Sequence, residues 1–430
     1  MRRHSVVRRW TAVMLTAAAV GRAFCQGSGV LTVENADSLV GGEIRGEAIR
    51  ELIGNVRFHQ ESVQVRCDRA VQYTGKGRVE LLGNVVVRDG PVTLRSPRGV
   101  YHRDGRRAEA FDGVMMEDGA SRVRSASAAY MVEERIASFQ GSVSVEDSAG
   151  VLQADSLVSF RAEDRSIAFG SVSVLSRTDG VTVTGGRLES LQGRRISRVT
   201  EDPVLYQADT GPGGSAETLI VRSREMELHR DTLRRLVVRD SVEILRGELA
   251  GRSSGAVFFA GGDSIHLRGS PVLWYGESQI TGDSINVYLR GRRLDRVEVG
   301  GNAMAVSRPA PGLPRRFDQL RGERLTMHFT GGELELVRVT GRAMSVFHLF
   351  EDTAAGGLNR TTGDAIAMRF RESRLDEVTV AGGVEGRYVP ENLLEGAEEE
   401  YALPGFFWRE DRPRVFPGRV PRPVRRGGDE

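Results

Sequence analysis

The sequence predicts an all-β fold, an elongated and repetitive β-jellyroll or solenoid-like trough of stacked antiparallel strands. Three observations lead to this prediction. Glycine is frequent, with 52 residues in a chain of 430, whereas proline is modest at 14. Short runs alternate apolar and polar residues, as half-buried strands do. A self-similar unit recurs along the chain, and repeats of this kind are typical of stacked architectures.

The first landmark of the repeat is Gly-[Asn/Ser]-Val. Clear copies begin at Gly54, Gly83, Gly141 and Gly170, and Gly113-Val114 is a shortened copy. These five glycines are spaced by 29, 30, 28 and 29 residues. Degenerate copies continue to residue 384, with spacings that lengthen to roughly 40 residues, as loop insertions would produce.

The second landmark is an aspartate followed by an alternating run. Its copies include Asp68, Asp155, Asp263, Asp283 and Asp364. Such a row could form a calcium ladder or pair catalytic carboxylates, or each aspartate could cap a turn by bonding the backbone two residues on. The several Asp and Gly per nine residues of calcium-binding β-helices are missing, so we favour the turn role.

A third landmark closes each unit with another alternating run, as in Arg293–Val299 (RLDRVEV) and Arg374–Val380 (RLDEVTV). Each unit therefore supplies about three short strands joined by tight turns. One unit cannot bury its apolar face alone, but stacked copies can. We assign residues 26–390 to tandem repeats of this kind, forming two or more consecutive jellyroll modules.

The two ends of the chain differ from the repeats. Residues 1–25 resemble a signal peptide, with a basic start, an apolar core at Trp10–Val20 and a small-x-small site at Ala23-Phe24-Cys25. Residues 391–430 are rich in Arg and Pro and predict a flexible tail. Its aromatic cluster, Phe406-Phe407-Trp408, would dock on a partner or pack back on the last repeat, and we favour packing back.

Charge and cysteine content exclude several classes of protein. The formal charge is +2, but residues 1–25 hold five arginines and no acid, so the remaining chain carries −3. This balance gives no footprint for nucleic acid. The only cysteines are Cys25 and Cys67, so a chain cleaved after Cys25 has no internal disulfide. Cys67 stands where other repeats have Ala or Gly, which indicates a small core site and an unreactive thiol.

No catalytic or cofactor motif is recognisable in the sequence. The seven histidines lack metal-ligand spacing, and no nucleophile elbow or phosphate loop occurs. We therefore expect no catalytic residue, no metal and no cofactor, and a protein that binds or scaffolds and is not an enzyme.

The tandem landmarks behind an export signal resemble the OstA-like/LptA family of periplasmic lipopolysaccharide-transport proteins. The clearest stretches are Leu52–Tyr73, Leu81–Val87, Phe139–Phe160 and Asn359–Val384, and the resemblance covers about residues 30–390. It implies a β-jellyroll with an apolar inside that binds lipopolysaccharide or a related glycolipid. It also implies a periplasmic location, in association with the outer membrane, and a bridging role in outer-membrane assembly. The chain has about twice the repeats of a minimal family member and lacks the translocon's membrane barrel.

Moving a lipid through water requires a continuous apolar lining, because each exposed methylene costs about 0.8 kcal/mol. The candidate lining residues are Val56, Phe58, Val85, Val87, Val143, Val145, Val172 and Val174. The same alternation would also form a closed, dry core. The open ends of the stack, near Leu31–Leu39 and Leu375–Val384, would pair with edge strands of other bridge proteins or of a second copy.

Two other functions fit an exported β-repeat. One is a secreted β-solenoid adhesin or surface protein without lipid cargo, although no Ser/Thr/Asn-rich outer face or anchoring module is evident. The other is a carbohydrate-active β-helix, which would need a cluster of carboxylates that interrupts the repeat. We find no such interruption.

Overall fold

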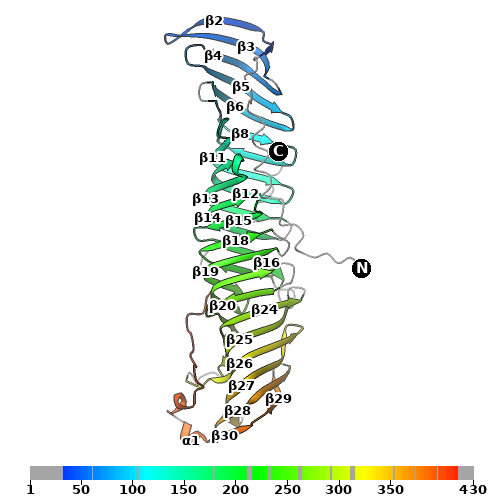
Figure 1. Ribbon diagram of the computed structural model, residues 1–430, viewed down its shortest axis with the longest axis vertical. Coiled ribbons are helices and arrows are strands. Elements are labelled where there is room, and N and C mark those ends of the chain that lie inside the picture. Colours follow the sequence, from blue (N-terminus) through cyan, green and yellow to red (C-terminus); the bar gives the residue numbers. More distant parts are fainter. Residues whose placement is uncertain are drawn as a thin grey trace, which may run out of the picture. The chain divides into compact units, whose positions relative to one another are not determined.

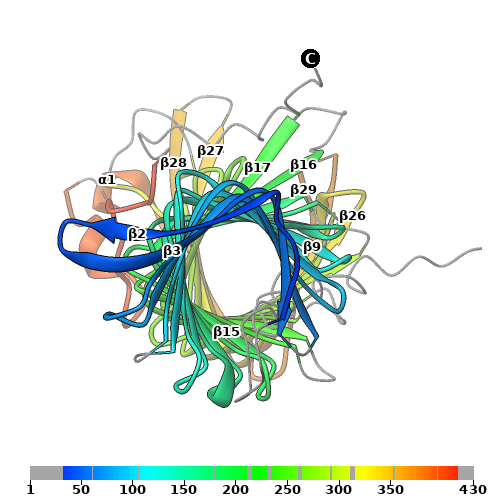
Figure 2. The same ribbon diagram turned by 90° about the horizontal axis from the view of Figure 1, so that it is seen from above.

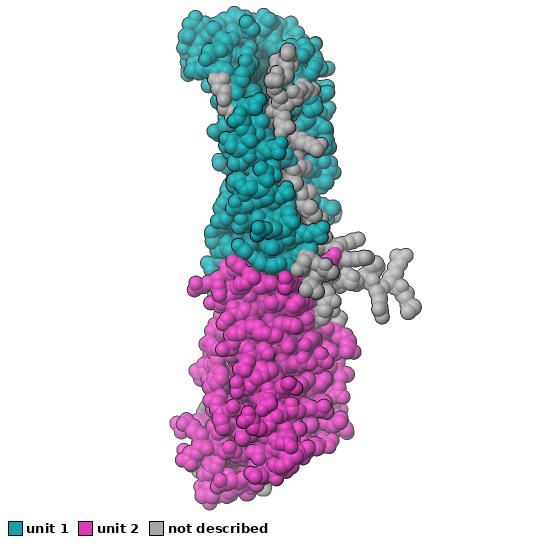
Figure 3. Space-filling view, in the orientation of Figure 1, with its two compact units in different colours: residues 1–203, 227–231 teal, residues 204–226, 232–430 magenta. Residues whose placement is uncertain are grey.

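The protein is described from a computed structural model. The described residues are 32–60, 62–103, 106–177, 180–210, 216–230, 234–259, 264–290, 293–309, 315–351, 354–372, 374–394 and 396–414. The signal peptide expected at residues 1–25 lies outside them. The chain divides into unit 1, up to residue 203 with residues 227–231, and unit 2, residues 204–226 and 232–430 (Figure 3).

Unit 1 consists of antiparallel strands that follow one another along the chain (Figure 1). Its strands are β1 (Thr32–Asn35), β2 (Ser38–Ile44), β3 (Glu47–Gln60), β4 (Val63–Tyr73), β5 (Arg78–Asp89), β6 (Val92–His102), β7 (Arg107–Phe111), β8 (Val114–Glu117), β9 (Ser121–Ser125), β10 (Ser127–Met131), β11 (Ile136–Asp147), β12 (Gly150–Phe160), β13 (Arg165–Ser176), β14 (Val181–Leu191) and β15 (Ile196–Thr200). A 3-10 turn, η2 (Arg161–Glu163), joins β12 to β13. Strand β18 (Glu225–His229) crosses the unit boundary in the sequence.

Unit 2 repeats the same design. Its strands are β16 (Val204–Thr210), β17 (Ala216–Arg222), β19 (Arg235–Arg246), β20 (Leu249–Phe259), β21 (Ser264–Arg268), β22 (Val272–Tyr275), β23 (Ser278–Thr281), β24 (Ser284–Arg290), β25 (Arg293–Ser307), β26 (Asp318–Thr330), β27 (Glu333–Glu351), β28 (Ala354–Arg371), β29 (Arg374–Ala381) and β30 (Glu385–Val389). Two short helical turns follow, α1 (Glu391–Leu394) and η4 (Glu398–Tyr401). The predicted all-β fold of stacked antiparallel strands is confirmed in both units.

The four clear copies of Gly-[Asn/Ser]-Val are corners inside long strands, whereas the shortened copy Gly113-Val114 lies where β7 ends and β8 begins. In β5 the pairing register shifts between Leu82 and Val85, where Gly83 has φ 70° and Asn84 has φ 49°. Two consecutive positive φ values form a β-bulge that bends the strand, and glycine adopts the first without strain. The bent path of β3, which contains the corner at Gly54, can be followed in Figure 2.

The corners correct the prediction of three short strands per unit. Between Gly54 and Gly83 the chain forms the second half of β3, all of β4 and the first half of β5, which amounts to two long strands. A bulge bends a strand without interrupting its pairing. The Gly-Asn pairs that resemble chain-reversing turns in the sequence are therefore bends within strands.

Because the long strands bend, each unit has two walls. Each bent strand contributes one half to each wall. In unit 1, wall A contains the halves that pair with β2, β7, β10 and β15, and wall B contains the halves that pair with β1, β8 and β9. Alternate side chains of both walls meet in one apolar cluster, as at Val63, Val65 and Cys67 of β4, whereas Gln64 and Arg66 are exposed. This cluster is the interior of unit 1.

In unit 2, residues 391–414 pack against the outer face of a wall, which corrects the predicted flexible tail over this range. Leu394 and Leu403 are buried in a cluster with Met304, Val306 and Val346. Phe406 and Trp408 pack against the same cluster, in line with the favoured packing back. Residues 415–430 lie outside the described part of the chain. We call residues 391–414 the strap.

Two glutamines hold the strap by its backbone. Gln319 accepts a hydrogen bond from the Leu403 N–H at 2.8 Å. Gln279 accepts one from the Arg409 N–H at 2.8 Å and donates one to the Phe407 carbonyl at 2.9 Å. Both glutamines are at most 4% exposed. The strap thus covers an outer face that is apolar and would otherwise be exposed.

Candidate functional site

The predicted lining residues lie together on the inner face of wall B in unit 1. They occupy the same two positions after the corners of four strands, β3, β5, β11 and β13. Seven are buried, and Val174 is partly buried against the same cluster. The residues are Val56, Phe58, Val85, Val87, Val143, Val145, Val172 and Val174. That they contact a lipid stays a prediction.

The strands between these positions add residues that the sequence analysis missed. Each member of the completed row stands opposite the next on a neighbouring strand: Phe58, Val65, Val87, Leu94, Met116, Val123, Val145, Leu152, Val174 and Val183. At ~4.8 Å per strand, the row is about 43 Å long. The signal for the missed residues was period-two alternation, as in Val63-Gln64-Val65.

A cavity of about 100 Å³ opens next to Phe58. On the same measure one water needs roughly 10–15 Å³, so the space exceeds a packing defect. Its lining includes Phe58, Val65, Val85, Val87 and Leu94 from wall B and Val79, Leu81, Gly99, Ala108 and Ala110 from wall A. The cavity exists because wall A places small side chains, Gly99 and Ala110, in register with Leu81. Apolar cavities of this kind accept apolar guests.

The recurring aspartates lock the corners of neighbouring strands. The Asn84 side-chain amide donates to Asp68 at 2.8 Å, and Asn55 donates to Asp37 at 3.0 Å. The corner glycines leave room for these carboxylates, because a Cβ on Gly83 would lie 2.3 Å from an Asp68 oxygen. Asp155, Asp283 and Asp364 face Gly170, Gly301 and Gly382 in the same way.

This geometry refines the turn-capping interpretation of the aspartates. Asp68 bonds a residue 16 positions away in the sequence, on the next strand, instead of its own turn. The first landmark, Gly-[Asn/Ser]-Val, and the second, the aspartate, therefore contact each other across neighbouring strands. Asp263 lies outside the described residues.

The Cys67 thiol belongs to the interior and is 4% exposed. Burial raises its pKa to about 11. The thiolate, which is the reactive form, is therefore scarce at neutral pH.

Two findings concern other kinds of site. Within the described ranges, no group of three or more His, Cys, Asp or Glu side chains is arranged to hold a metal ion. No helix in this part of the chain has the length and apolar character needed to cross a membrane.

Exposed edge strands lie at the two places expected, apart from Leu31, which is outside the described residues. Among the described strands, β2 pairs only with β3, and β29 pairs only with β28. Leu39 of β2 is 67% exposed, and Leu375 and Val378 of β29 are each 47% exposed. Unpaired edges with apolar side chains can accept another strand.

Comparison with known proteins supports the resemblance stated from the sequence. Residues 29–156 match the family model described as OstA-like protein, so the resemblance is confirmed over that range and stays a prediction beyond it. No curated protein matches the chain. A similar solved structure is LptH from Pseudomonas aeruginosa, an LptA homologue and periplasmic component of a lipopolysaccharide transport device. It is 14% identical with a TM-score of 0.26, and the match covers 33% of this chain and 95% of LptH.

Proposed function

From the OstA-like character of residues 29–156, we propose that the protein binds lipopolysaccharide or a related glycolipid and carries it through the periplasm to the outer membrane. The observation that carries this proposal is the apolar row from Phe58 to Val183, with the cavity beside Phe58. Acyl chains would lie along the row, and the polar head of the lipid would remain in water.

The energetics of transport fit a row of similar sites. A twelve-carbon acyl chain transferred from water gains roughly 10 kcal/mol, so the cargo needs apolar contact at every step. One deep pocket would retain the lipid, whereas repeated Val and Leu positions offer similar affinity along the row. The row combines valines with larger apolar side chains, and no charged residue interrupts it.

We further propose that the exposed edges, β2 and β29, pair with strands of other bridge proteins or of a second copy. Leu39→Lys would weaken pairing at β2, because a charge on an edge opposes strand addition. Leu349→Lys, at a residue 41% exposed in β27, is the matched control. Unchanged capture of partners by the β2 variant in cells would refute edge pairing.

Lipid that co-purifies with the protein tests the cargo directly. The protein is isolated from cells without detergent, extracted with organic solvent, and the extract is analysed by mass spectrometry. We expect a multiply acylated, phosphorylated glycolipid, and we expect much less of it with Val145→Asp in the row. An extract with no lipid, or with ordinary phospholipid in equal amount from both proteins, would contradict the proposal.

The adhesin alternative predicts a different result. A protein without lipid cargo would lose nothing on substitution inside a cavity, provided that it still folds. No described feature favours a second function over lipid transport.

A further inference from the structure

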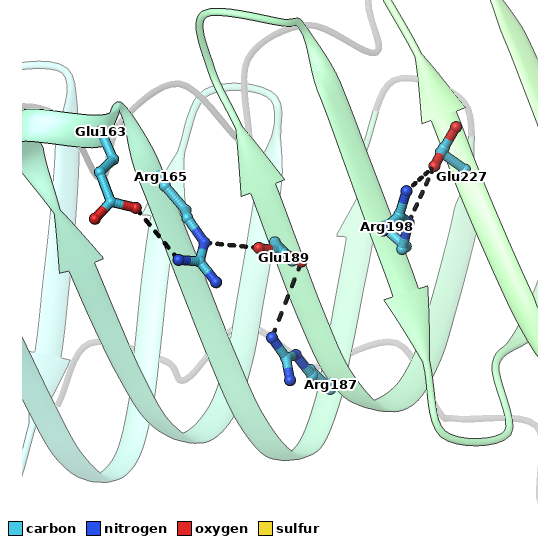
Figure 4. Close-up of polar contacts among 6 residues, drawn as sticks. All are labelled: Glu163, Arg165, Arg187, Glu189, Arg198 and Glu227. Atoms are coloured by element: carbon cyan, nitrogen blue, oxygen red, sulfur yellow. Dashed lines mark hydrogen bonds and ion pairs between the residues drawn. The ribbon is translucent and has the colours of Figure 1, made fainter.

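The two outer faces of unit 1 carry their arginines differently. On wall A the arginines that Figure 4 shows are paired with carboxylates. Arg165 contacts Glu189 at 2.6 Å and Glu163 at 3.2 Å, and Arg187 lies 3.9 Å from Glu189. Farther along this face, Arg198 contacts Glu227 at 2.6 Å. This face is balanced by its own acids.

The outer face of wall B, from β3 to β9, is not balanced. We call its exposed arginines the Arg face: Arg57, Arg66, Arg88, Arg95, Arg122 and Arg124. Among the described residues of these strands, the one carboxylate on this face is Glu117, which lies 3.6 Å from Arg95 and 2.7 Å from Arg122. At the β1 side of the face, Glu34 lies 2.9 Å from His59. Glu146 on the next strand pairs with Arg177.

The guanidinium groups of three members of the Arg face, Arg57, Arg66 and Arg88, form no hydrogen bond or ion pair with any described residue. Arg57 stands directly opposite Arg66 on the neighbouring strand. Like charges placed opposite one another destabilise a sheet. Arg57 and Arg66 therefore form a repulsive pair, and a neutral side chain at either position would make the sheet more stable.

The arginines are spread over a surface and do not converge on a point. Arg66 and Arg95 stand on either side of Val86, and Arg95 and Arg124 stand on either side of Met115. At ~4.8 Å per strand, the six strands from β3 to β9 span about 24 Å. Guanidinium groups at this spacing would each bind a separate anionic group, and the planar fork suits a phosphate.

We propose that the Arg face docks the protein on an anionic membrane surface through the phosphates of lipid head groups. The face is open and extended, as a membrane is, and its charge is complementary to that of phosphate-bearing lipids. It lies on the opposite side of wall B from the Phe58 row, so docking leaves the interior free. The inference goes beyond the proposed function, because a protein with no cargo could bind a membrane in this way.

Partition onto lipid vesicles tests the docking. The full chain is sedimented with vesicles of equal parts phosphatidylglycerol and phosphatidylcholine, and with vesicles of phosphatidylcholine alone. We expect binding only to the anionic vesicles. Arg57→Gln, Arg66→Gln and Arg88→Gln together should lower the partition coefficient about 100-fold, since each arginine near an anionic surface contributes roughly fivefold. Unchanged circular dichroism would show that the triple variant folds.

The matched control is Arg98→Gln, Arg107→Gln and Arg187→Gln, three arginines outside the Arg face that are paired with Asp112, Glu109 and Glu189. It changes the net charge by the same amount and keeps both terminal segments, so its binding should stay near that of the unaltered protein. An equal loss in both variants, or none in either, would overturn the proposal. Stronger release by inorganic phosphate than by chloride at equal ionic strength would indicate a small-anion site instead. Tighter, Arg-face-dependent binding to duplex DNA would also overturn the membrane assignment.

Discussion

Filling the cavity beside Phe58 should stabilise the protein and impair lipid binding at the same time. Ala110 lines this cavity and is 3% exposed. Ala110→Leu adds three carbon atoms, and at about 0.8 kcal/mol per buried carbon the upper limit of the gain is ~2.4 kcal/mol. Because the new side chain must also lose rotamer freedom, we expect a net gain of about 1–2 kcal/mol.

Gly99→Ala is the smaller version of the same change. Its new Cβ would lie 3.5 Å from the Glu109 carbonyl oxygen and 3.6 Å from Leu81, which are ordinary contacts. One added methyl group and a stiffer unfolded chain should together stabilise the protein by about 1 kcal/mol. Lipid binding should fall less than with Ala110→Leu, since less of the cavity is filled.

Urea unfolding and the amount of co-purified lipid measure the two effects. The control is Ala154→Leu, which makes the same change opposite Val143 at a buried position that does not line this cavity. Overpacking there should cost about 1–3 kcal/mol. If Ala110→Leu destabilises the protein as much as Ala154→Leu does, the cavity is not available space. If it stabilises the protein and leaves the bound lipid unchanged, the cargo does not use the cavity.

Three further predictions concern the corners, the thiol and the strap. Gly83→Ala should cost about 2–3 kcal/mol in urea unfolding, because its Cβ meets Asp68 and its φ is 70°. Adding Asp68→Ala should recover part of that loss, and full additivity of the two changes would contradict the contact. Burial raises the pKa of Cys67 to about 11, so the folded protein holds this proton more tightly than the unfolded chain does. This difference contributes on the order of 2–3 kcal/mol to the free energy of unfolding. The contribution is complete below the ordinary thiol pKa near 9 and is lost as the pH rises towards 11. A Cys67→Ala protein whose alkaline stability loss matched that of the parent would contradict this. Gln319→Ala should leave the Leu403 N–H without its acceptor, cost about 1–3 kcal/mol and speed hydrogen exchange there, and unchanged exchange would contradict the strap contact.

The repeat, its spacing and the inward position of the eight candidate residues could be predicted because alternation and a fixed period survive in the sequence. Val56 and Val85, for example, occupy equivalent positions both in the sequence repeat and in the folded strands. The bend at each corner could not be predicted, since Gly-Asn is equally typical of a chain-reversing turn and of a bulge. The partner of Asp68 could not be predicted either, because it depends on the pairing register between strands.

The strap shows a second limit of sequence patterns. Val272, Leu273 and Trp274 are all buried, so β22 is covered on both faces, and such a run has no period-two signal. The composition of residues 391–414 predicts disorder, but Leu394 and Leu403 are buried on an apolar outer face that only the folded wall creates. The composition of the strap carries no information about the apolar outer face against which the strap packs.

Photo-cross-linking from Phe58 in cells with labelled lipopolysaccharide tests the central claim most directly. p-Benzoyl-phenylalanine keeps the phenyl ring of Phe58 and adds a benzoyl group, for which the cavity lined by Phe58 offers space. The control is the same probe at Phe169, which is 37% exposed. Probes at Val87 and Val145 would then follow the row. We predict lipopolysaccharide adducts at Phe58, Val87 and Val145 and none at Phe169. A folded protein without adducts at the three inner positions would contradict lipid transport through the interior.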